Sequence, residues 1–341
     1  MDELIKNLFE EPKEIQMVSN EEERKETKDE KEELDTKLIS SGTYGCIYHP
    51  GLSCSYDSTK IRDNNERKNK ITKIQFKGNA ANKELHISEK IKMNNPANYA
   101  YHFITFDNAC DVEMNEIRTQ ITETKTSSDK NATIELEKCP VFNKDKNKGK
   151  NDLVMIEMKY VDASELKDMV VEMSDKREIM SIIFESLINN LTGVECLHKA
   201  NVVHFDLKSN NILFDKETTH PYIIDFGLSI DIDQMKEIKN KTRENMNAFF
   251  INHSPGYIVW TPEVKYFTLM MYKGEDPTEE EVNSLTEDTM KAYSVFKELF
   301  SDDFMKKFKA LLNATYMQYR EDMKEIPMED RLNVFFDNIL L

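Results

Sequence analysis

The amino-acid sequence predicts an α+β protein of two lobes, a small lobe rich in strands followed by a larger helical lobe. Two observations support this fold class. Stretches with the alternation of half-buried strands are concentrated between residues 38 and 161, whereas helical periodicity dominates residues 162–341. A chain of 341 residues is long enough for two such lobes around a sizeable core.

An acidic arm precedes the small lobe. Residues 1–37 contain 14 Asp or Glu and 7 Lys or Arg, a net charge of −7, and the segment EEERKETKDEKEELD has no apolar periodicity. A segment without a periodic apolar face has little to bury in a core. We therefore expect a solvated arm that is disordered or helical.

The small lobe, residues 38–161, is predicted from strand and turn signals. LISSGTYGCIYHPG has the glycines of a strand–turn–strand unit, and KITKIQF alternates polar with apolar residues as a half-exposed strand does. YHFITF and LVMIEMKYV are further strand candidates, and NAANKELHISEKIKM is expected to be a helix. A polar insertion is expected at about residues 107–152, where few apolar residues could anchor a core, and we interpret it as partly disordered.

The helical lobe, residues 162–341, contains the clearest helix of the chain, Lys176 to His198. Its apolar residues recur at steps of three and four, the spacing of one helix face. They are Ile179, Ile183, Leu187, Leu191, Val194 and Leu197. The part after Glu263 is charged and helical in pattern, as in EEEVNSLTEDTMKAYSVFKELF.

The composition argues against several classes of protein. A net charge of −17 disfavours a general nucleic-acid binder, which needs a basic face. No apolar run approaches the roughly 20 residues that span a bilayer, and the acidic start lacks the pattern of a secretory signal. Five cysteines without a C-x-x-C pair predict neither a disulfide framework nor a zinc site. We therefore expect a cytoplasmic protein with no nucleic-acid partner and no membrane span.

The stretch VVHFDLKSNNILF, Val202 to Phe214, sets a charged island between apolar flanks. Phosphoryl transfer to a hydroxyl needs a carboxylate that orients the hydroxyl, cations on the phosphate, and oxygen ligands for Mg²⁺. Asp206, Lys208 and Asn211 can supply these functions from one short loop. Asp225, in IIDFG, follows 19 residues after Asp206, close enough for a hairpin to return a second metal-binding carboxylate to the same cleft.

These motifs resemble those of the protein kinases. HFDLKSNN is similar to the catalytic loop H-R-D-L-K-x-x-N, DFG at 225–227 to the metal-binding motif, and TPE at 261–263 to the A-P-E that closes the activation segment. The resemblance covers about residues 38–263. Further matches fall in the expected order: Ser40, Gly42 and Gly45 in the glycine-rich loop SSGTYGCI, Ile47 on the strand after it, Lys73 on the third strand, Glu84 as its helix partner, Met158 near the gatekeeper, and Tyr160 in the hinge.

The resemblance implies a two-lobed kinase-like fold and direct transfer of the γ-phosphoryl group from Mg·ATP to a protein hydroxyl. The eight residues from Ser40 to Tyr160 would form the nucleotide site, and Asn211 and Asp225 would hold Mg²⁺. Asp206 would orient the acceptor, and Lys208 would neutralise charge on the γ-phosphoryl group. A lysine two residues after the base resembles serine/threonine kinases more than tyrosine kinases, which implies a protein substrate with a Ser or Thr acceptor. The oligomeric state does not follow from the sequence.

Some assignments have rivals. Lys68 and Lys70 compete with Lys73, which the strand register favours, and Glu89 competes with Glu84. His204 is interpreted as a packing and hydrogen-bonding residue rather than a base.

Phe205 departs from the family pattern. The arginine at this position commonly pairs with a phosphate on the activation segment, and phenylalanine cannot form that ion pair. The sequence therefore predicts activity that does not depend on phosphorylation of this segment, although Ser229, Thr242, Ser254 and Tyr257 lie in it.

A narrower resemblance concerns the divergent protein kinases of poxviruses and other large DNA viruses, on the basis of YGCIYHPGLSC, the long insertion and YIVWTPEV. It implies virion or structural proteins as substrates, in the cytoplasm of an infected cell or in the virion. The family's later helix start, D-x-W-S-x-G, has no counterpart between residues 264 and 341. We expect a helical lobe that is either built differently or incomplete at its C-terminal end.

Two rival functions follow from the same motifs. Small-molecule phosphotransferases of the aminoglycoside or choline type share the H-x-D…N pattern, but they usually lack both the lysine after the base and the A-P-E-like closure. An inactive kinase-like scaffold typically loses the base, the strand lysine or the DFG aspartate. Asp206, Lys73 and Asp225 are all present here, so the sequence favours an active protein kinase.

Overall fold

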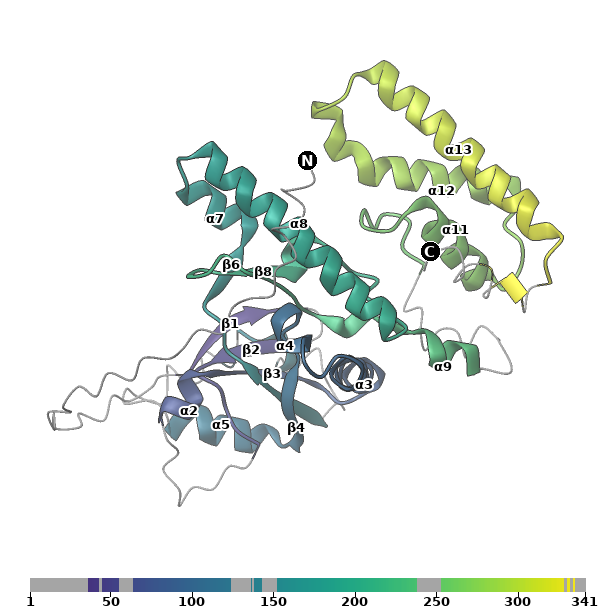
Figure 1. Ribbon diagram of the computed structural model, residues 1–341. Coiled ribbons are helices and arrows are strands. Elements are labelled where there is room, and N and C mark those ends of the chain that lie inside the picture. Colours follow the sequence, from purple (N-terminus) through teal and green to yellow (C-terminus); the bar gives the residue numbers. More distant parts are fainter. Residues whose placement is uncertain are drawn as a thin grey trace, which may run out of the picture. The chain divides into compact units, whose positions relative to one another are not determined.

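The structure, a computed structural model, describes residues 36–42, 45–54, 64–123, 136, 138–142, 152–237, 253–327, 330–331 and 334 (Figure 1). Of the acidic arm predicted for residues 1–37, only Thr36 and Lys37 belong to the described residues.

The small lobe is built on a five-stranded antiparallel sheet with the strand order β1-β2-β3-β5-β4. Its strands are β1 (Lys37–Ser41), β2 (Gly45–His49), β3 (Lys70–Phe76), β4 (Phe106–Val112) and β5 (Leu153–Lys159). The helices and the 3-10 turn that the structure describes beside them are α2 (Asn64–Lys68), α3 (Asn79–Asn94), α4 (Tyr99–His102), α5 (Met114–Glu123) and η1 (Pro140–Phe142). The strands predicted from KITKIQF and LVMIEMKYV and the helix predicted from NAANKELHISEKIKM are confirmed as β3, β5 and α3.

Each face of this sheet packs against a different helix, because successive residues of a strand point to opposite faces. Ile156 of β5 lies in a buried cluster with Ala81 of α3. Its neighbour Met155 lies in a second cluster with Ile117 and Ile121 of α5. β5, between β3 and β4, is therefore buried on both faces, which explains its nearly continuous apolar sequence.

Part of the expected insertion belongs to the core of the small lobe. The strand predicted at residues 101–106 is wrong, because residues 99–102 form α4 and the strand, β4, runs from Phe106 to Val112. Leu136, Val141 and Phe142 are buried in the cluster that also holds α5. The described part of residues 107–152 thus has the core anchors that the sequence did not predict. Most of these buried apolar residues have polar neighbours in the sequence. No short stretch around them therefore shows the apolar pattern that predicts a buried segment.

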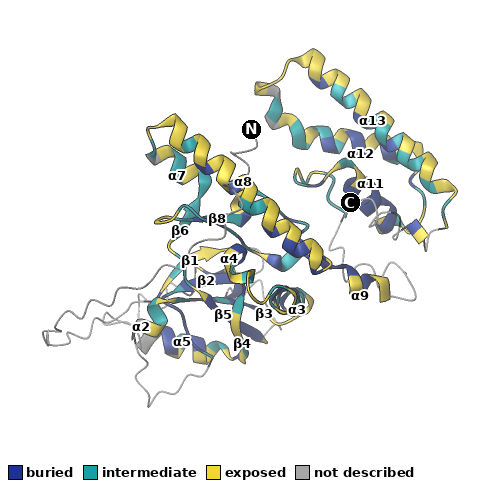
Figure 2. Cartoon of the chain, in the orientation of Figure 1, coloured by how far each residue is buried: buried dark blue, intermediate teal, exposed yellow. Residues whose placement is uncertain are grey.

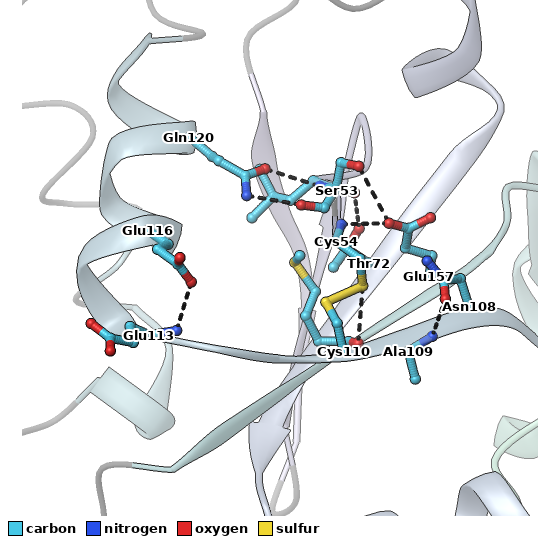
Figure 3. Close-up of a disulfide and its surroundings, with 12 residues drawn as sticks. Ser53, Cys54, Thr72, Asn108, Ala109, Cys110, Glu113, Glu116, Gln120 and Glu157 are labelled. Atoms are coloured by element: carbon cyan, nitrogen blue, oxygen red, sulfur yellow. Dashed lines mark hydrogen bonds between the residues drawn. A yellow bond between two sulfur atoms is a disulfide. The ribbon is translucent and has the colours of Figure 1, made fainter. Parts of the chain in front are cut away.

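Two disulfides correct the prediction that the cysteines form no framework. Cys46 of β2 is bonded to Cys139, 93 residues away, and Cys54 is bonded to Cys110 of β4, 56 residues away. Cys196 is free and buried, which accounts for the odd number. In Figure 3, Gln120 of α5 holds Ser53, beside the second disulfide, by hydrogen bonds of 2.9 and 3.0 Å. The Cys54–Cys110 disulfide ties the loop after β2 to the sheet, and the Cys46–Cys139 disulfide ties the region of η1 to it.

The helical lobe contains six described α-helices: α7 (Leu166–Glu172), α8 (Lys176–Lys199), α9 (Ile232–Glu237), α11 (Pro262–Lys273), α12 (Glu279–Ala292) and α13 (Asp302–Lys324). Short strands accompany them: β6 (Ala163–Glu165) directly before α7, and β7 (Val202–Val203), β8 (Ile212–Asp215), β9 (Pro221–Ile223) and β10 (Ile230–Asp231) between α8 and α9. Ile230, Met270, Leu285 and Tyr316 share one buried cluster, so the helices after residue 260 pack against the segment that follows DFG. The helical pattern predicted after Glu263 is confirmed.

The helix predicted at Lys176 to His198 is confirmed as α8, but its apolar face is largely exposed. Leu197 is buried, whereas Leu187 is 53 % and Leu191 60 % exposed. Figure 2 shows exposed residues along much of α8. The periodicity identified the helix correctly, and the buried side of α8 is marked by Ile182, Ser186, Gly193 and Cys196.

The predicted α+β fold, with a β-rich first lobe and a helical second lobe, is confirmed. In the part of the chain that the structure describes, every helix is too short or too polar to cross a membrane.

Candidate functional site

The predicted catalytic loop lies between β7 and β8, and hydrogen bonds within the loop fix its side chains. Asp206 is only 5 % exposed. The side-chain nitrogen of Asn211 donates to the Asp206 carbonyl oxygen at 2.8 Å and to its carboxylate at 3.0 Å. The Lys208 ammonium lies 3.0 Å from each oxygen of the same carboxylate. The three side chains chosen from the sequence therefore converge on one point.

His204 is buried behind this loop. Its Nε2 lies 3.0 Å from the Ile224 carbonyl oxygen, and the backbone N–H of Asp206 donates to Nδ1 at 3.3 Å. These partners assign the proton to Nε2. Burial lowers the pKa of His204, so the ring is neutral near pH 7. His204 thus joins the catalytic loop to the strand before Asp225, as a structural residue does.

Phe205 has a left-handed backbone conformation, with φ of 64°. For a residue other than glycine this conformation costs on the order of 1 kcal/mol or more, and such strain is concentrated at functional sites. The Phe205 carbonyl accepts a hydrogen bond from Nε1 of Trp260 at 3.0 Å, and the two rings lie 5.0 Å apart. Phe205 stands where protein kinases commonly have an arginine. Its ring therefore makes an apolar contact with the segment before TPE instead of an ion pair.

The hairpin of β8 and β9 returns Asp225 to the catalytic loop. The two strands are antiparallel, and the Ile224 N–H donates to the Asn211 carbonyl at 3.0 Å. Asp225 also has a left-handed backbone, with φ of 63°, and its Oδ1 lies 3.8 Å from Nζ of Lys73. The interval of 19 residues between Asp206 and Asp225 is thus spanned by a short hairpin.

Lys73 and Glu84 form an ion pair between β3 and α3. Nζ of Lys73 lies 2.7 and 2.8 Å from the two Glu84 oxygens, and Gln75 donates to the same carboxylate at 3.2 Å. Both partners are largely buried. Glu89 is exposed on α3, and Lys70 pairs with Glu66 at 2.8 Å. The structure therefore pairs the lysine and the glutamate that were favoured over their rivals.

The glycine-rich loop joins β1 and β2, and its residues 43–44 lie outside the described residues. The Gly42 N–H donates to the Gly45 carbonyl at 2.9 Å. A Cβ atom at Gly45 would lie 2.7 Å from the Ile74 carbonyl oxygen, so a side chain there would push β2 away from β3. Gly42 has open space around it. Gly45 is thus required by strand packing, whereas Gly42 leaves the backbone open to a ligand.

These residues line one cavity of about 380 Å³. Eleven of the twelve predicted site residues contribute to it, from the glycine-rich loop, β3, α3, β5, the catalytic loop and DFG: Ser40, Gly42, Gly45, Ile47, Lys73, Glu84, Met158, Asp206, Lys208, Asn211 and Asp225. Tyr160 is the exception. Its ring stacks on His49 at 3.8 Å, and its N–H donates to the Asn69 carbonyl at 2.8 Å, so its side chain and its N–H have other partners.

The cavity has the chemistry of a site for a magnesium nucleotide. Apolar side chains such as Ile47, Ile156 and Met158 suit a base, while Lys73 supplies a cation. No cluster of three His, Cys, Asp or Glu that could hold a metal occurs among the described residues. Asp225 and the amide oxygen of Asn211 nevertheless fit Mg²⁺, which usually takes one or two protein oxygens and completes its shell with phosphates and water.

The buried carboxylate of Asp231 joins α3 to the segment after DFG. Asp231 is 4 % exposed and accepts hydrogen bonds from Lys90 and, at 2.7 Å, from His86, both on α3. It also accepts the backbone N–H of Asp233 at 2.9 Å at the start of α9. Burial raises the pKa of Asp231, but the hydrogen bonds from Lys90 and His86 outweigh it, so its pKa is lowered. The helix that carries Glu84 is thereby fixed to the activation segment.

Tyr257, in the activation segment, reaches the catalytic loop. Its hydroxyl donates to Oδ1 of Asp206 and lies 3.2 Å from Nζ of Lys208. The sequence did not predict Asp231 or Tyr257 at the site. Neither residue belongs to a sequence motif that indicates its role. That role follows only from the residues that contact it in the folded chain.

Comparisons with known proteins show which family the chain resembles. Residues 36–252 match the family model described as "Protein kinase domain". Death-associated protein kinase 2 of Homo sapiens and of Mus musculus are each 31 % identical to the chain over 176 residues, which is 46 % of this chain and 46 % of theirs.

Two further relatives match over shorter stretches. The SNF1-related protein kinase catalytic subunit alpha KIN12 of Arabidopsis thaliana is 39 % identical over 80 residues, 23 % of this chain and 15 % of its own. The probable serine/threonine-protein kinase fnkB of Dictyostelium discoideum is 31 % identical over 110 residues, 32 % and 18 % of the two chains. The chain therefore spans less than half the length of each of these curated relatives.

Proposed function

The chain belongs to the protein kinase family, and we propose that it transfers the γ-phosphoryl group of ATP to serine or threonine hydroxyls of protein substrates. The observation that carries this proposal is the convergence of Asp206, Lys208 and Asn211 in one cavity with the Lys73–Glu84 ion pair. These side chains support the proposal because phosphoryl transfer needs a carboxylate for the acceptor, a cation for the phosphates and oxygen ligands for Mg²⁺.

Some of these side chains act on the nucleotide, and others act on the hydroxyl of the protein acceptor. Lys73, oriented by Glu84, binds the α- and β-phosphates, and the backbone of the glycine-rich loop covers them. Asp206 orients the acceptor hydroxyl and takes up its proton, and Lys208 stabilises negative charge on the transferring group. Asn211 and Asp225 would hold Mg²⁺, which when bound neutralises charge on the phosphates. The hydrogen bonds of Asn211 to Asp206 keep the base and the metal ligand in register.

Specificity for Ser and Thr is the finer part of the proposal. The position of Lys208, 3.0 Å from the base, supports it. The Dictyostelium discoideum relative also supports it, because that protein is described as a probable serine/threonine-protein kinase.

The proposal is tested by phosphate incorporation from labelled Mg·ATP into three acceptors: a serine peptide, the same peptide with tyrosine, and a small amino alcohol. We expect transfer to the serine peptide and a loss of at least about 100-fold in Lys73→Met. Lys70→Met is the matched control, since Lys70 is on the same strand but pairs with Glu66. Transfer only to the alcohol would support a small-molecule phosphotransferase. ATP binding without transfer to any acceptor would support an inactive scaffold.

Location and substrate are proposed on narrower grounds. The sequence resemblance to kinases of large DNA viruses suggests virion or structural proteins as substrates, in the infected cytoplasm or the virion. Disulfides are rare in the cytosol and persist in virions. The Cys46–Cys139 and Cys54–Cys110 bonds therefore favour the virion. Thiol alkylation of the protein in isolated particles, before and after reduction, measures the oxidised fraction, and four reactive thiols before reduction would contradict this location.

A further inference from the structure

A second cavity, of about 320 Å³, adjoins the nucleotide cavity. Ile104 and Thr105, just before β4, line both cavities. The other walls of the second cavity come mainly from α2, α4, the first residue of β3, the last residue of β5, and β9. Its volume falls within the range of sites for small ligands. The proposed kinase mechanism assigns no role to the residues that line this cavity alone.

One wall of the second cavity is aromatic and fixed in place. Phe103 is 2 % exposed, and the rings of Tyr99 and Tyr222, which also line the cavity, are partly buried. The Ile104 N–H donates to the Ile223 carbonyl at 3.3 Å, and Phe103 forms a β-bridge with Ile223. The backbone behind the rings is therefore bonded to β9. A pre-formed wall of this kind suits the flat face of an aromatic ligand.

Two lysines line the second cavity from neighbouring strands. Lys70 of β3 and Lys159 of β5 are directly opposite each other in the antiparallel register. Their Cβ atoms are therefore about 5 Å apart on one face of the sheet, and their charges repel each other. Lys70 is compensated by Glu66 at 2.8 Å and by Glu157 at 3.5 Å. Lys159 is exposed and forms no ion pair with any residue that the structure describes.

The remaining polar groups of the second cavity are a carboxylate and a hydroxyl. Asp107 is exposed, and its charge acts on Lys92: burial lowers the pKa of Lys92, and Asp107 opposes that shift. Thr105 is 6 % exposed, and its hydroxyl makes no hydrogen bond with another described residue. A buried hydroxyl in this state gains a hydrogen bond when a polar ligand group reaches it. The cation of Lys159 and the hydroxyl of Thr105 are thus the groups that a ligand can satisfy.

We propose that the second cavity is a ligand site for a small aromatic compound that carries a carboxylate. The aromatic ring lies against Phe103 and the two tyrosines, and the carboxylate pairs with Lys159. An anion at this point also reduces the repulsion between Lys159 and Lys70. Binding here is separate from phosphate transfer, so the inference does not rest on the proposed function.

Phenylacetate is the probe that tests the site. It is titrated at low salt into the purified full chain, with the nucleotide cavity filled by a non-hydrolysable Mg·ATP analogue, and binding is followed by saturation-transfer NMR. We expect a Kd of about 1 mM or tighter. A Kd weaker than about 10 mM would overturn the proposal. Release of phenylacetate by the ATP analogue would place the probe in the nucleotide cavity and would also overturn it.

Three further probes separate the ring from the charge. We expect acetate, which has no ring, to bind undetectably, and 2-phenylethanol and phenethylamine to bind about three- to fivefold more weakly than phenylacetate. Acetate that binds as well as phenylacetate would show ion binding by surface lysines and overturn the aromatic part. Phenethylamine that binds as tightly would identify Asp107 as the charged partner and overturn the anionic part.

Two variants place the probe in the cavity. Lys159→Met should weaken phenylacetate binding about fivefold and leave 2-phenylethanol binding unchanged. Ala100→Trp adds a ring on the exposed wall of α4, fills the cavity and should abolish binding of both probes. Lys167→Met is the matched control, because Lys167 is an exposed lysine outside the cavity that pairs with Glu165, and it should keep the wild-type Kd. Wild-type affinity in both Lys159→Met and Ala100→Trp would overturn the assignment.

Discussion

Asp231→Asn is the perturbation that tests how α3 is held in place. The substitution removes a charge but keeps a side chain that caps a helix equally well, so the N-terminus of α9 keeps its cap. What is lost is the carboxylate that receives Lys90 and His86 from α3. Asp233→Asn is the matched control, because Asp233 also pairs with Lys90, at 2.7 Å, but is 51 % exposed.

The expected magnitude follows from the burial of the pair. Removing one partner of a fully buried ion pair costs about 3–5 kcal/mol, because the other charge is left without a partner. Lys90 is 14 % exposed and keeps Asp233, so we expect a loss in unfolding free energy of about 2 kcal/mol for Asp231→Asn. For Asp233→Asn we expect about 0.5 kcal/mol or less, as for other exposed pairs.

The assays are thermal or denaturant unfolding and steady-state transfer to a serine peptide. A loss of 2 kcal/mol lowers the melting temperature by about 4 °C or more. If the whole loss of 2 kcal/mol destabilises the position of α3, the fraction of molecules in which Glu84 pairs with Lys73 falls by up to about 30-fold, and kcat falls by the same factor.

The pH dependence of this contribution to stability has a defined sign. Because the pKa of Asp231 is lowered on folding, its contribution is complete well above pH 3.8 and is lost as pH falls below that value. Equal stability and activity of the two variants would refute this reasoning.

Three further predictions concern other parts of the chain. Glu84→Gln is expected to lower kcat/KM by about tenfold or more, as the ion pair that orients Lys73 weakens, whereas Glu89→Gln on the exposed side of α3 keeps the wild-type value in the same peptide assay. Cys54→Ser should lower the unfolding free energy by about 3 kcal/mol, measured with denaturant, and a reductant that leaves the wild-type midpoint unchanged would contradict this. Thr278→Ala should cost about 1 kcal/mol, because Thr278 and Glu281 form the capping box of α12; since Lys273 and the Thr278 N–H lower the pKa of Glu281 to about 2, its part of this stability is present above pH 4.5 and is lost as pH falls toward 2.

The sequence predicted the elements whose signal is local. β3 was predicted residue for residue, and α8 to within one residue, because strand alternation and helical spacing are complete within each segment. Asp206, Lys208 and Asn211 were found for the same reason, since one short loop carries all three and a hairpin returns Asp225.

What the sequence did not predict depends on partners far along the chain. The disulfide partners are 93 and 56 residues apart, and the pairing of cysteines does not follow from their order. Asp231 has no recognisable role until α3 brings Lys90 and His86 to it, 141 and 145 residues away in sequence. Tyr257 was one of four hydroxyl residues noted in its segment, and only the turn at Trp260 directs it to Asp206.

In the proposed mechanism, Asp206 acts on the acceptor hydroxyl and not on the nucleotide. The most direct measurement is a comparison of wild type and Asp206→Asn, with Mg·ATP affinity determined by titration calorimetry and transfer to a serine peptide determined in single turnovers. We predict an unchanged affinity within about twofold and a transfer rate reduced by about 10²–10⁴. An Asp206→Asn protein that transfers phosphate at the wild-type rate, or that loses ATP binding in proportion to its activity, would contradict the claim.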